Sequence, residues 1–157
     1  MTVIDRLEEM FVKNDVRYKL FDHPLAISAQ KTAQAEHVPG AEEAKVVIVR
    51  VAGRDMMAVL PATHHVDLEK LKTLFETDEA RIANEPELRR LFPDCEVGAM
   101  PPFGHLYELP LLLDKSFEGR AKIVFNAGSH TEAIRMKYDD YLRLANPLTG
   151  DFAVRNG

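Results

Sequence analysis

The chain has 157 residues, of which 46% are hydrophobic and 29% charged. This composition is that of a folded globular domain and excludes a disordered chain. The longest apolar run, Leu109–Leu113, contains a proline and is far shorter than the roughly 20 residues that span a bilayer. The net charge of -5 excludes a protein that binds nucleic acid over its whole surface, because such proteins are basic. Any contact with nucleic acid must use a small local patch.

Cysteine usage and the N-terminus indicate the compartment. The single cysteine, Cys95, cannot form an internal disulfide, which fits a reducing cytoplasm. Its acidic neighbours Asp94 and Glu96 are expected to raise the pKa of the thiol and leave it inert. The first ten residues contain no apolar segment of the kind found in secretory signals. Since there is also no repeat or linker, we predict a single cytoplasmic domain over residues 1–157.

Hydrophobic periodicity predicts the elements of the first half of the chain. Ile4, Leu7 and Phe11 recur at helical spacing, and Thr2 is placed to cap that helix. The β-branched run after residue 45 predicts a central strand covered on both faces. In chain order we expect a strand over Val16–Phe21, a helix over Ser28–Ala35, strands over Lys45–Ala52 and Met56–Leu60 joined by a turn at Gly53–Asp55, and helices that begin at the caps Asp67 and Asn84.

Strands dominate the prediction for the second half. Glycines and prolines mark Val97–Gly104 as a loop. Helices and strands do not alternate strictly, so neither a doubly wound sheet nor a (β/α)8 barrel fits. We predict an α+β fold whose mixed, strongly curved β-sheet is surrounded by helices. Its later elements are expected to be strands over Leu106–Leu113, Lys122–Asn126 and Ala133–Lys137 and a helix over Asp139–Asn146.

Lys45 opens the most apolar strand of the chain. A lysine in this place can hold its ammonium at the end of a sheet and bind an anion. The alternative interpretation is a charge that leaves the core for solvent, as lysine side chains usually do.

The segment Gly98–Gly104 has the sequence Gly-Ala-Met-Pro-Pro-Phe-Gly. Glycines allow backbone torsions that other residues avoid, and prolines stiffen a segment. Such a loop can aim several backbone N–H groups at one oxyanion or phosphate. We therefore expect substitution of Gly98 or Gly104 to damage activity more than stability. The alternative is a rigid connector between a helix and a strand.

A second glycine loop contains Gly128, Ser129 and His130. It lacks the Gly-x-Ser-x-Gly pattern of a nucleophile elbow, and adjacent serine and histidine side chains rarely align for proton transfer. Two interpretations remain, a ligand-positioning histidine and a structural loop histidine. The other histidines lack metal-ligand spacing and the chain has one cysteine, so we expect neither a metal nor another cofactor.

Taken together, these segments resemble the YbaK/prolyl-tRNA synthetase associated domain family, the trans-editing aminoacyl-tRNA deacylases. The resemblance extends from about Ile4 to Leu144. It is carried by Ala44-Lys45 at the start of the valine-rich strand, by the Gly98–Gly104 loop, by the segment Phe125–His130 and by the closing segment Met136–Tyr141.

The resemblance implies an enzyme that hydrolyses the ester between a wrong amino acid and tRNA. The Gly-Ser-His loop is most similar to the branch that clears alanine from proline tRNA. The implied partners are the acceptor end of mischarged tRNA and an aminoacyl-tRNA synthetase, with no membrane involved. Alanine and valine flank Lys45, so a polar neighbour found in some branches is missing. The implied catalytic residues are Lys45, Gly98, Gly104 and His130, and the implied substrate-binding residues are Met100, Pro102, Phe103, Gly128 and Ser129.

The chemistry agrees with this set of residues. An aminoacyl ester is already activated, so hydrolysis needs a positioned water and stabilisation of an oxyanion. We expect the stiff segment from Met100 to Phe103 to exclude proline sterically, with His130 on the facing side. The alternative is that Phe103 packs in the core and His130 caps its loop. Two other functions remain open: a non-catalytic module that binds tRNA or a synthetase, and a small-molecule esterase that uses Ser129 and His130.

Overall fold

The structure is a computed structural model that describes residues 1–22 and 42–156. The helix expected over Ser28–Ala35 lies outside these residues. The described elements are α1 (Val3–Lys13), β1 (Tyr18–Asp22), β2 (Ala44–Val51), β3 (Arg54–Pro61), β4 (His64–Val66), α3 (Leu68–Leu74), β5 (Ala80–Ile82), α4 (Glu85–Leu91), the 3-10 turn η1 (Gly104–Tyr107), β6 (Leu111–Asp114), the 3-10 turn η2 (Lys115–Phe117), β7 (Lys122–Asn126), β8 (Glu132–Lys137), α5 (Tyr138–Ala145), β9 (Leu148–Gly150) and β10 (Ala153–Arg155).

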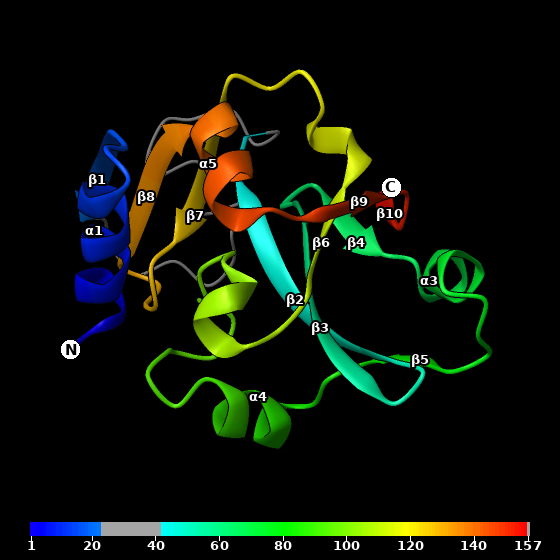
Figure 1. The fold of residues 1–157 in the computed structure, drawn as a ribbon. Helices are drawn as coiled ribbons and strands as arrows, with labels where there is room; N and C mark the ends of the chain where they lie inside the picture. Colours follow the sequence, from blue (N-terminus) through cyan, green and yellow to red (C-terminus); the bar gives the residue numbers. More distant parts are fainter. Residues whose placement is uncertain (23–41, 157) are drawn as a thin grey trace.

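The strands form three hydrogen-bonded groups, with the orders β1-β8-β7, β5-β2-β3-β6-β9 and β10-β4 (Figure 1). β6 is parallel to β3 and to β9, and the other paired strands are antiparallel. A single parallel bridge between Glu43 and Val124 joins β7 to the start of β2, where the Val124 N–H donates to the Glu42 carbonyl at 3.0 Å. The expected α+β class with a mixed, curved sheet is therefore confirmed.

The larger hydrophobic core lies between these sheets and the helices α1 and α5 (Figure 1). Val3, Leu7 and Phe11 bury one face of α1, which confirms the helix expected from their spacing. Thr2 and Asp5 form a reciprocal capping box at its start, an arrangement that stabilises a helix by about 1 kcal/mol. No helix in the described ranges is long and apolar enough to cross a membrane.

A smaller core covers the other face of the five-stranded sheet. It contains Val49, Val51, Leu60, Leu71 and Phe152. Alternate residues of β2 therefore enter different cores, and the strand is buried on both faces as its valine-rich sequence predicts.

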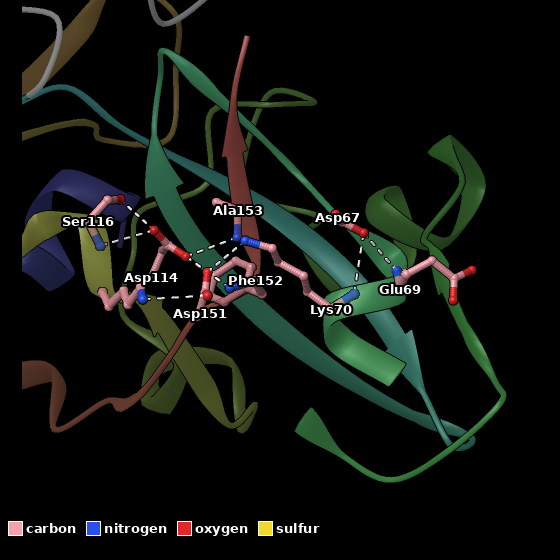
Figure 2. A network of polar contacts seen from close by, with 9 residues as sticks. Asp67, Glu69, Lys70, Asp114, Ser116, Asp151, Phe152 and Ala153 are labelled. Atoms are coloured by element: carbon pink, nitrogen blue, oxygen red, sulfur yellow. Dashed lines mark hydrogen bonds and ion pairs between the residues drawn. The ribbon is translucent and has the colours of Figure 1, made fainter. Parts of the chain in front are cut away.

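Asp114, at the end of β6, ties the last strand to the sheet (Figure 2). Its buried Oδ1 accepts hydrogen bonds from the N–H groups of Phe152 and Ala153 at 3.0 and 2.9 Å. Its Oδ2 accepts from the Ser116 N–H at 3.0 Å and from the Ser116 hydroxyl. Asp151 beside it forms an ion pair with Lys70 at 3.0 Å. These contacts hold β10 where it pairs with β4.

Several sequence-based boundaries differ from those of the structure, among them the start of β1, the start of β6 and the β2–β3 turn. The segment expected to be a strand from Leu106 begins as η1, where the Leu109 N–H donates to the Gly104 carbonyl at 2.9 Å, and the strand begins only at Leu111. The β2–β3 hairpin turns at Ala52-Gly53, where both residues have positive φ, rather than at residues 53–55. Four strands of three residues each were not predicted: β4, β5, β9 and β10.

Candidate active site

Lys45 lies on the face of β2 opposite the larger core. Its neighbours Ala44 and Val46 enter that core, and side chains alternate along a strand, so Lys45 points to the other side. Val124 and Asn126 of β7 point to this side too, because Ile123 and Phe125 enter the larger core. We call this side of the joined sheets the Lys45 face.

The Lys45 ammonium is half-buried and without a hydrogen bond or ion pair among the described residues. Burial lowers its pKa below the ordinary value of a lysine. The same ammonium lies close enough to His64 to help lower the pKa of that imidazole, although burial is the larger cause there. A desolvated and unpaired cation is costly in a folded protein, and an anionic ligand would satisfy it.

Asn126 is a candidate site residue to which the sequence analysis assigned no role. It is 6% exposed, and its Oδ1 is buried with no hydrogen-bond partner in the described structure. Buried polar atoms without partners are rare, and they are often found where a ligand or water completes the set. The bridge between Glu43 and Val124 places Asn126 and Lys45 two residues further along two neighbouring strands, on the same face. The signals in the sequence were a polar residue at the end of an apolar strand and its place in the Phe125–His130 segment.

The two glycine loops are bonded to each other directly after Asn126. The Gly128 N–H donates to the Ala99 carbonyl at 2.9 Å, and the Glu96 N–H donates to the Gly128 carbonyl at 2.8 Å. Gly128 is buried, and a Cβ there would meet Val3 of α1 at 2.8 Å. The structure therefore brings together the Gly98 end of one loop, the Gly128 loop and the end of β7.

His130, in the second loop, forms a further hydrogen bond next to the first loop. Its Nε2 lies 2.8 Å from the Val97 carbonyl oxygen, which can only accept, so Nε2 carries the proton. A Cβ added to Gly98 would lie 3.5 Å from His130 Cε1, so the ring lies beside Gly98. The remaining ring nitrogen, Nδ1, is buried with no partner in the described part of the chain. His130 thus has a clear structural contact with the first loop and one unused acceptor.

Ser129 is not paired with His130. Its hydroxyl donates to Glu132 Oε1 at 3.1 Å and lies 3.2 Å from the Thr131 hydroxyl. The imidazole of His130 instead donates to Val97. This arrangement provides no serine–histidine dyad, so the esterase expected as one alternative lacks its catalytic pair.

The far half of the Gly98–Gly104 loop belongs to the core. Phe103 is fully buried, and its ring packs edge-on against Phe11, Phe125 and Tyr141 at centroid distances of 6.1, 5.5 and 5.3 Å. Met100 is also buried in this core, and the Pro102 carbonyl accepts a hydrogen bond from the Tyr141 hydroxyl at 2.9 Å. The side chain of Phe103 therefore has a packing role, which corrects the expectation that it forms a wall against the substrate.

Gly104 also has a packing explanation. A Cβ at this residue would lie 2.3 Å from the Leu109 carbonyl oxygen, a distance that forces the backbone to move. Gly98 differs, because it is exposed and has a φ of +85° while a Cβ would make only ordinary contacts. The expectation that both glycines serve activity more than stability is thus corrected for Gly104.

Three backbone donors of the loop have no protein acceptor in the described ranges, namely the N–H groups of Gly98, Met100 and Gly104. The Ala99 N–H, in contrast, donates to the Glu96 carbonyl. N–H groups that are free and held in a rigid segment are the kind of donor that stabilises an oxyanion.

Cys95 lies beside this junction but lacks the properties of a nucleophile. Burial, assisted by the Asp94 charge, raises the pKa of its thiol to about 11, and its Sγ is 3.2 Å from the Tyr107 hydroxyl. The thiol is therefore protonated at neutral pH, as expected, although burial contributes more than its acidic neighbours do.

Comparison with known proteins agrees with the resemblance seen in the sequence. The 152 aligned residues of the multifunctional Ser/Thr-tRNA deacylase ProXp-y from Escherichia coli K12 are 27% identical, covering 94% of this chain and 90% of the relative. The same relative in Escherichia coli O157:H7 gives the same values.

Solved structures show the same fold. A candidate trans-editing enzyme for prolyl-tRNA synthetase superposes with a TM-score of 0.82 at 20% identity, over 100% of this chain and 99% of that one. A hypothetical protein of known structure gives a TM-score of 0.83 at 19% identity, over 94% and 99% of the two chains. The model of the aminoacyl-tRNA editing domain matches residues 23–144. The chain therefore belongs to the aminoacyl-tRNA editing domain family.

Proposed function

We propose that this protein hydrolyses the ester bond of mischarged aminoacyl-tRNA and so releases the wrong amino acid. The observation that carries the proposal is the unpaired, half-buried ammonium of Lys45 on the face it shares with Asn126, where β7 leads into the two bonded glycine loops. Membership of the editing-domain family supports the same reaction.

The geometry suggests a division of roles. Lys45 supplies the cation that holds a phosphate of the terminal nucleotides. Water attacks the ester carbonyl, and the negative charge that develops on the carbonyl oxygen is stabilised by the free N–H groups of Gly98 and Met100. Loss of one such donor costs about 3 kcal/mol, or on the order of a hundredfold in rate. The tetrahedral intermediate then collapses to a free amino acid and the ribose hydroxyl.

We propose that His130 positions the substrate amino group or the water and is not the nucleophile. Its Nε2 proton is donated to Val97, which holds the first loop against the second. The unpartnered Nδ1 provides an acceptor for the substrate amino group or the water once a ligand opens the junction. In this proposal no covalent intermediate forms, because the Ser129 hydroxyl is engaged with Glu132.

Two substrates are candidates for the amino acid that is released. Alanine on proline tRNA is the one implied by the Gly-Ser-His loop. Serine or threonine is favoured by the buried, unpartnered Oδ1 of Asn126, which can accept a hydrogen bond from the hydroxyl of either amino acid. The Escherichia coli relative, whose name describes a Ser/Thr-tRNA deacylase, supports the same two amino acids. A site that bonds a hydroxyl discriminates strongly against amino acids that lack it.

A deacylation panel tests the reaction and the substrate together. The free protein is incubated with alanyl-, seryl-, threonyl- and prolyl-tRNA, and release of the labelled amino acid is measured. We expect release of a small wrong amino acid, sparing of proline on its own tRNA, and loss of most activity in Lys45→Ala. The exposed Lys13→Ala serves as the matched control. Equal hydrolysis of all four esters would contradict the exclusion of proline.

Asn126→Ala separates the two substrates. If the carboxamide bonds the substrate hydroxyl, this variant loses seryl or threonyl release while alanyl release changes little. A protein that binds tRNA but releases nothing from any ester would instead be a non-catalytic module of this fold.

A further inference from the structure

We infer that a groove across β1, β8 and β7 is the docking surface for the sugar-phosphate backbone of tRNA. The inference rests on the proposed function, and it assigns a surface that the reaction chemistry does not use. The groove has a volume of about 400 Å³ and is lined by Arg17, Tyr18, Lys19, Lys122, Arg135, Met136 and Lys137.

The groove is basic in a protein that is acidic overall. Five of its lining side chains are cations and none is an acid, whereas the whole chain has a net charge of -5. Of these five, Arg135 forms an ion pair with Glu42 at 3.3 Å, and the Lys19 ammonium lies 5.0 Å from the centre of the Phe21 ring. Arg17, Lys122 and Lys137 make no ion pair within the described structure, and Arg17 and Lys137 are exposed.

Strand pairing places like charges directly opposite each other. Lys122 is the register partner of Lys137, and Lys19 is the register partner of Arg135. Like charges in directly opposed positions of an antiparallel pair destabilise it. Glu42 compensates Arg135 of the second pair, but the Lys122–Lys137 pair has no ion-pair partner within the described structure. That pair is therefore unfavourable in the free protein, and an anionic ligand lying across it removes the repulsion.

A second charged hollow on the surface differs from the groove in its balance of charges. The hollow beside His64 contains Lys70, Lys115 and Arg155, but it also contains Asp114, Glu118 and Asp151. Asp151 forms an ion pair with Lys70 at 3.0 Å (Figure 2) and another with Lys115 at 3.5 Å. Its charges are thus balanced internally, whereas those of the β1–β8–β7 groove are not.

The groove and the candidate active site share one face and one strand. Lys122 and Asn126 lie at the two ends of β7 and both point to the Lys45 face. Four residues of extended strand separate them by about 13 Å. An RNA strand that follows the groove therefore reaches Asn126 and Lys45 within a few nucleotides, which suits a substrate whose reacting ester lies at its 3′ end.

The test compares two double variants with the same change of net charge. Lys122→Gln/Lys137→Gln removes the opposed pair in the groove. Lys13→Gln/Arg54→Gln removes two exposed cations outside it. Binding of uncharged tRNA is measured by fluorescence anisotropy at several salt concentrations, and deacylation is measured on full-length aminoacyl-tRNA and on an aminoacylated CCA trinucleotide.

The groove variant is expected to bind uncharged tRNA roughly tenfold more weakly, and its log–log salt slope is expected to become shallower by about 1.4–1.8. Its activity on the trinucleotide should match wild type, while the control pair binds tRNA normally. Unchanged tRNA binding in the groove variant, or equal losses in both variants, would overturn the inference. Failure of the proposed function can be distinguished from failure of this inference. If the wild-type protein releases no amino acid, its binding of uncharged tRNA still tests the groove.

Discussion

At the scale of single residues, the most important property of Lys45 is the free-energy cost of burying its charged ammonium. Burial disfavours the ammonium and lowers its pKa, and the described residues offer it no counter-ion. Removing such a charge relieves desolvation, so Lys45→Ala should leave the melting temperature unchanged or slightly raised. Loss of activity without loss of stability is the pattern expected of a residue kept for its ligand.

The direction of this pKa shift predicts a pH profile. If the ammonium is the active form, activity falls as the pH rises through the lowered pKa of Lys45, below the value of about 10.4 typical of a free lysine. Lys45→Arg keeps its charge throughout this range and should lose that alkaline limb, whatever its absolute rate. The measurement is kcat/KM against pH, corrected for hydrolysis of the ester without enzyme. A wild-type profile that stays flat to the usual lysine pKa would contradict the role.

Gly98 and Gly104 predict opposite phenotypes. Gly104→Ala drives a methyl group into the Leu109 carbonyl, so we expect overpacking to lower the free energy of unfolding by about 2 kcal/mol. Gly98→Ala meets only the His130 ring at van der Waals distance, and its positive φ costs about 1 kcal/mol. Chemical denaturation and deacylation rates separate the two. A stable Gly104→Ala, or a fully active Gly98→Ala, would reverse these assignments.

Site residues could be predicted from the sequence only where the residue type and its sequence neighbours indicate a chemical role. A lysine in a valine-rich strand and glycines beside prolines can be recognised in this way. Asn126 cannot, because its burial and its unpartnered oxygen arise from packing. The sequence left open whether Phe103 faces the substrate or packs in the core for the same reason, since its aromatic partners Phe11, Phe125 and Tyr141 come from distant segments.

At the scale of elements, β10 depends on one carboxylate. Asp114→Ala leaves the N–H groups of Phe152 and Ala153 buried without an acceptor. We expect a loss of about 3 kcal/mol, or roughly 10 °C in melting temperature for a chain of this size. Asp78→Ala, at an exposed position, is the control. A melting temperature within about 2 °C of the wild-type value would show that other contacts hold β10.

Local signals explain which elements were predicted correctly. The caps Thr2, Asp67 and Asn84 all bond the first turns of their helices, because capping involves residues within three positions of each other. The short strands were missed because their stability comes from distant partners. β10, for example, exists through the pairing of Ala153 with Val66 and through Asp114.

At the scale of the whole molecule, net charge and local charge predict different behaviour toward salt. A net charge of -5 alone predicts repulsion from tRNA, but three groove cations without internal partners predict about three phosphate contacts. The log–log slope of the binding constant against salt should then be roughly -2 to -3. Titration of tRNA binding at several potassium chloride concentrations measures it. A slope steeper than about -6 would mean that a much larger basic surface exists.

The pairing of β1 with β8 has a consequence for synthesis. Tyr18 and Met136 are register partners although roughly 110–120 residues separate such pairs along the chain, and contacts of this kind form late in folding. At about 5–20 residues per second, a ribosome needs roughly 6–24 s to make the intervening segment. During that interval Arg17 and Lys19 are isolated charges on an incomplete sheet. The nascent chain therefore cannot present the groove to surrounding RNA, and binding begins only when β8 closes against β1.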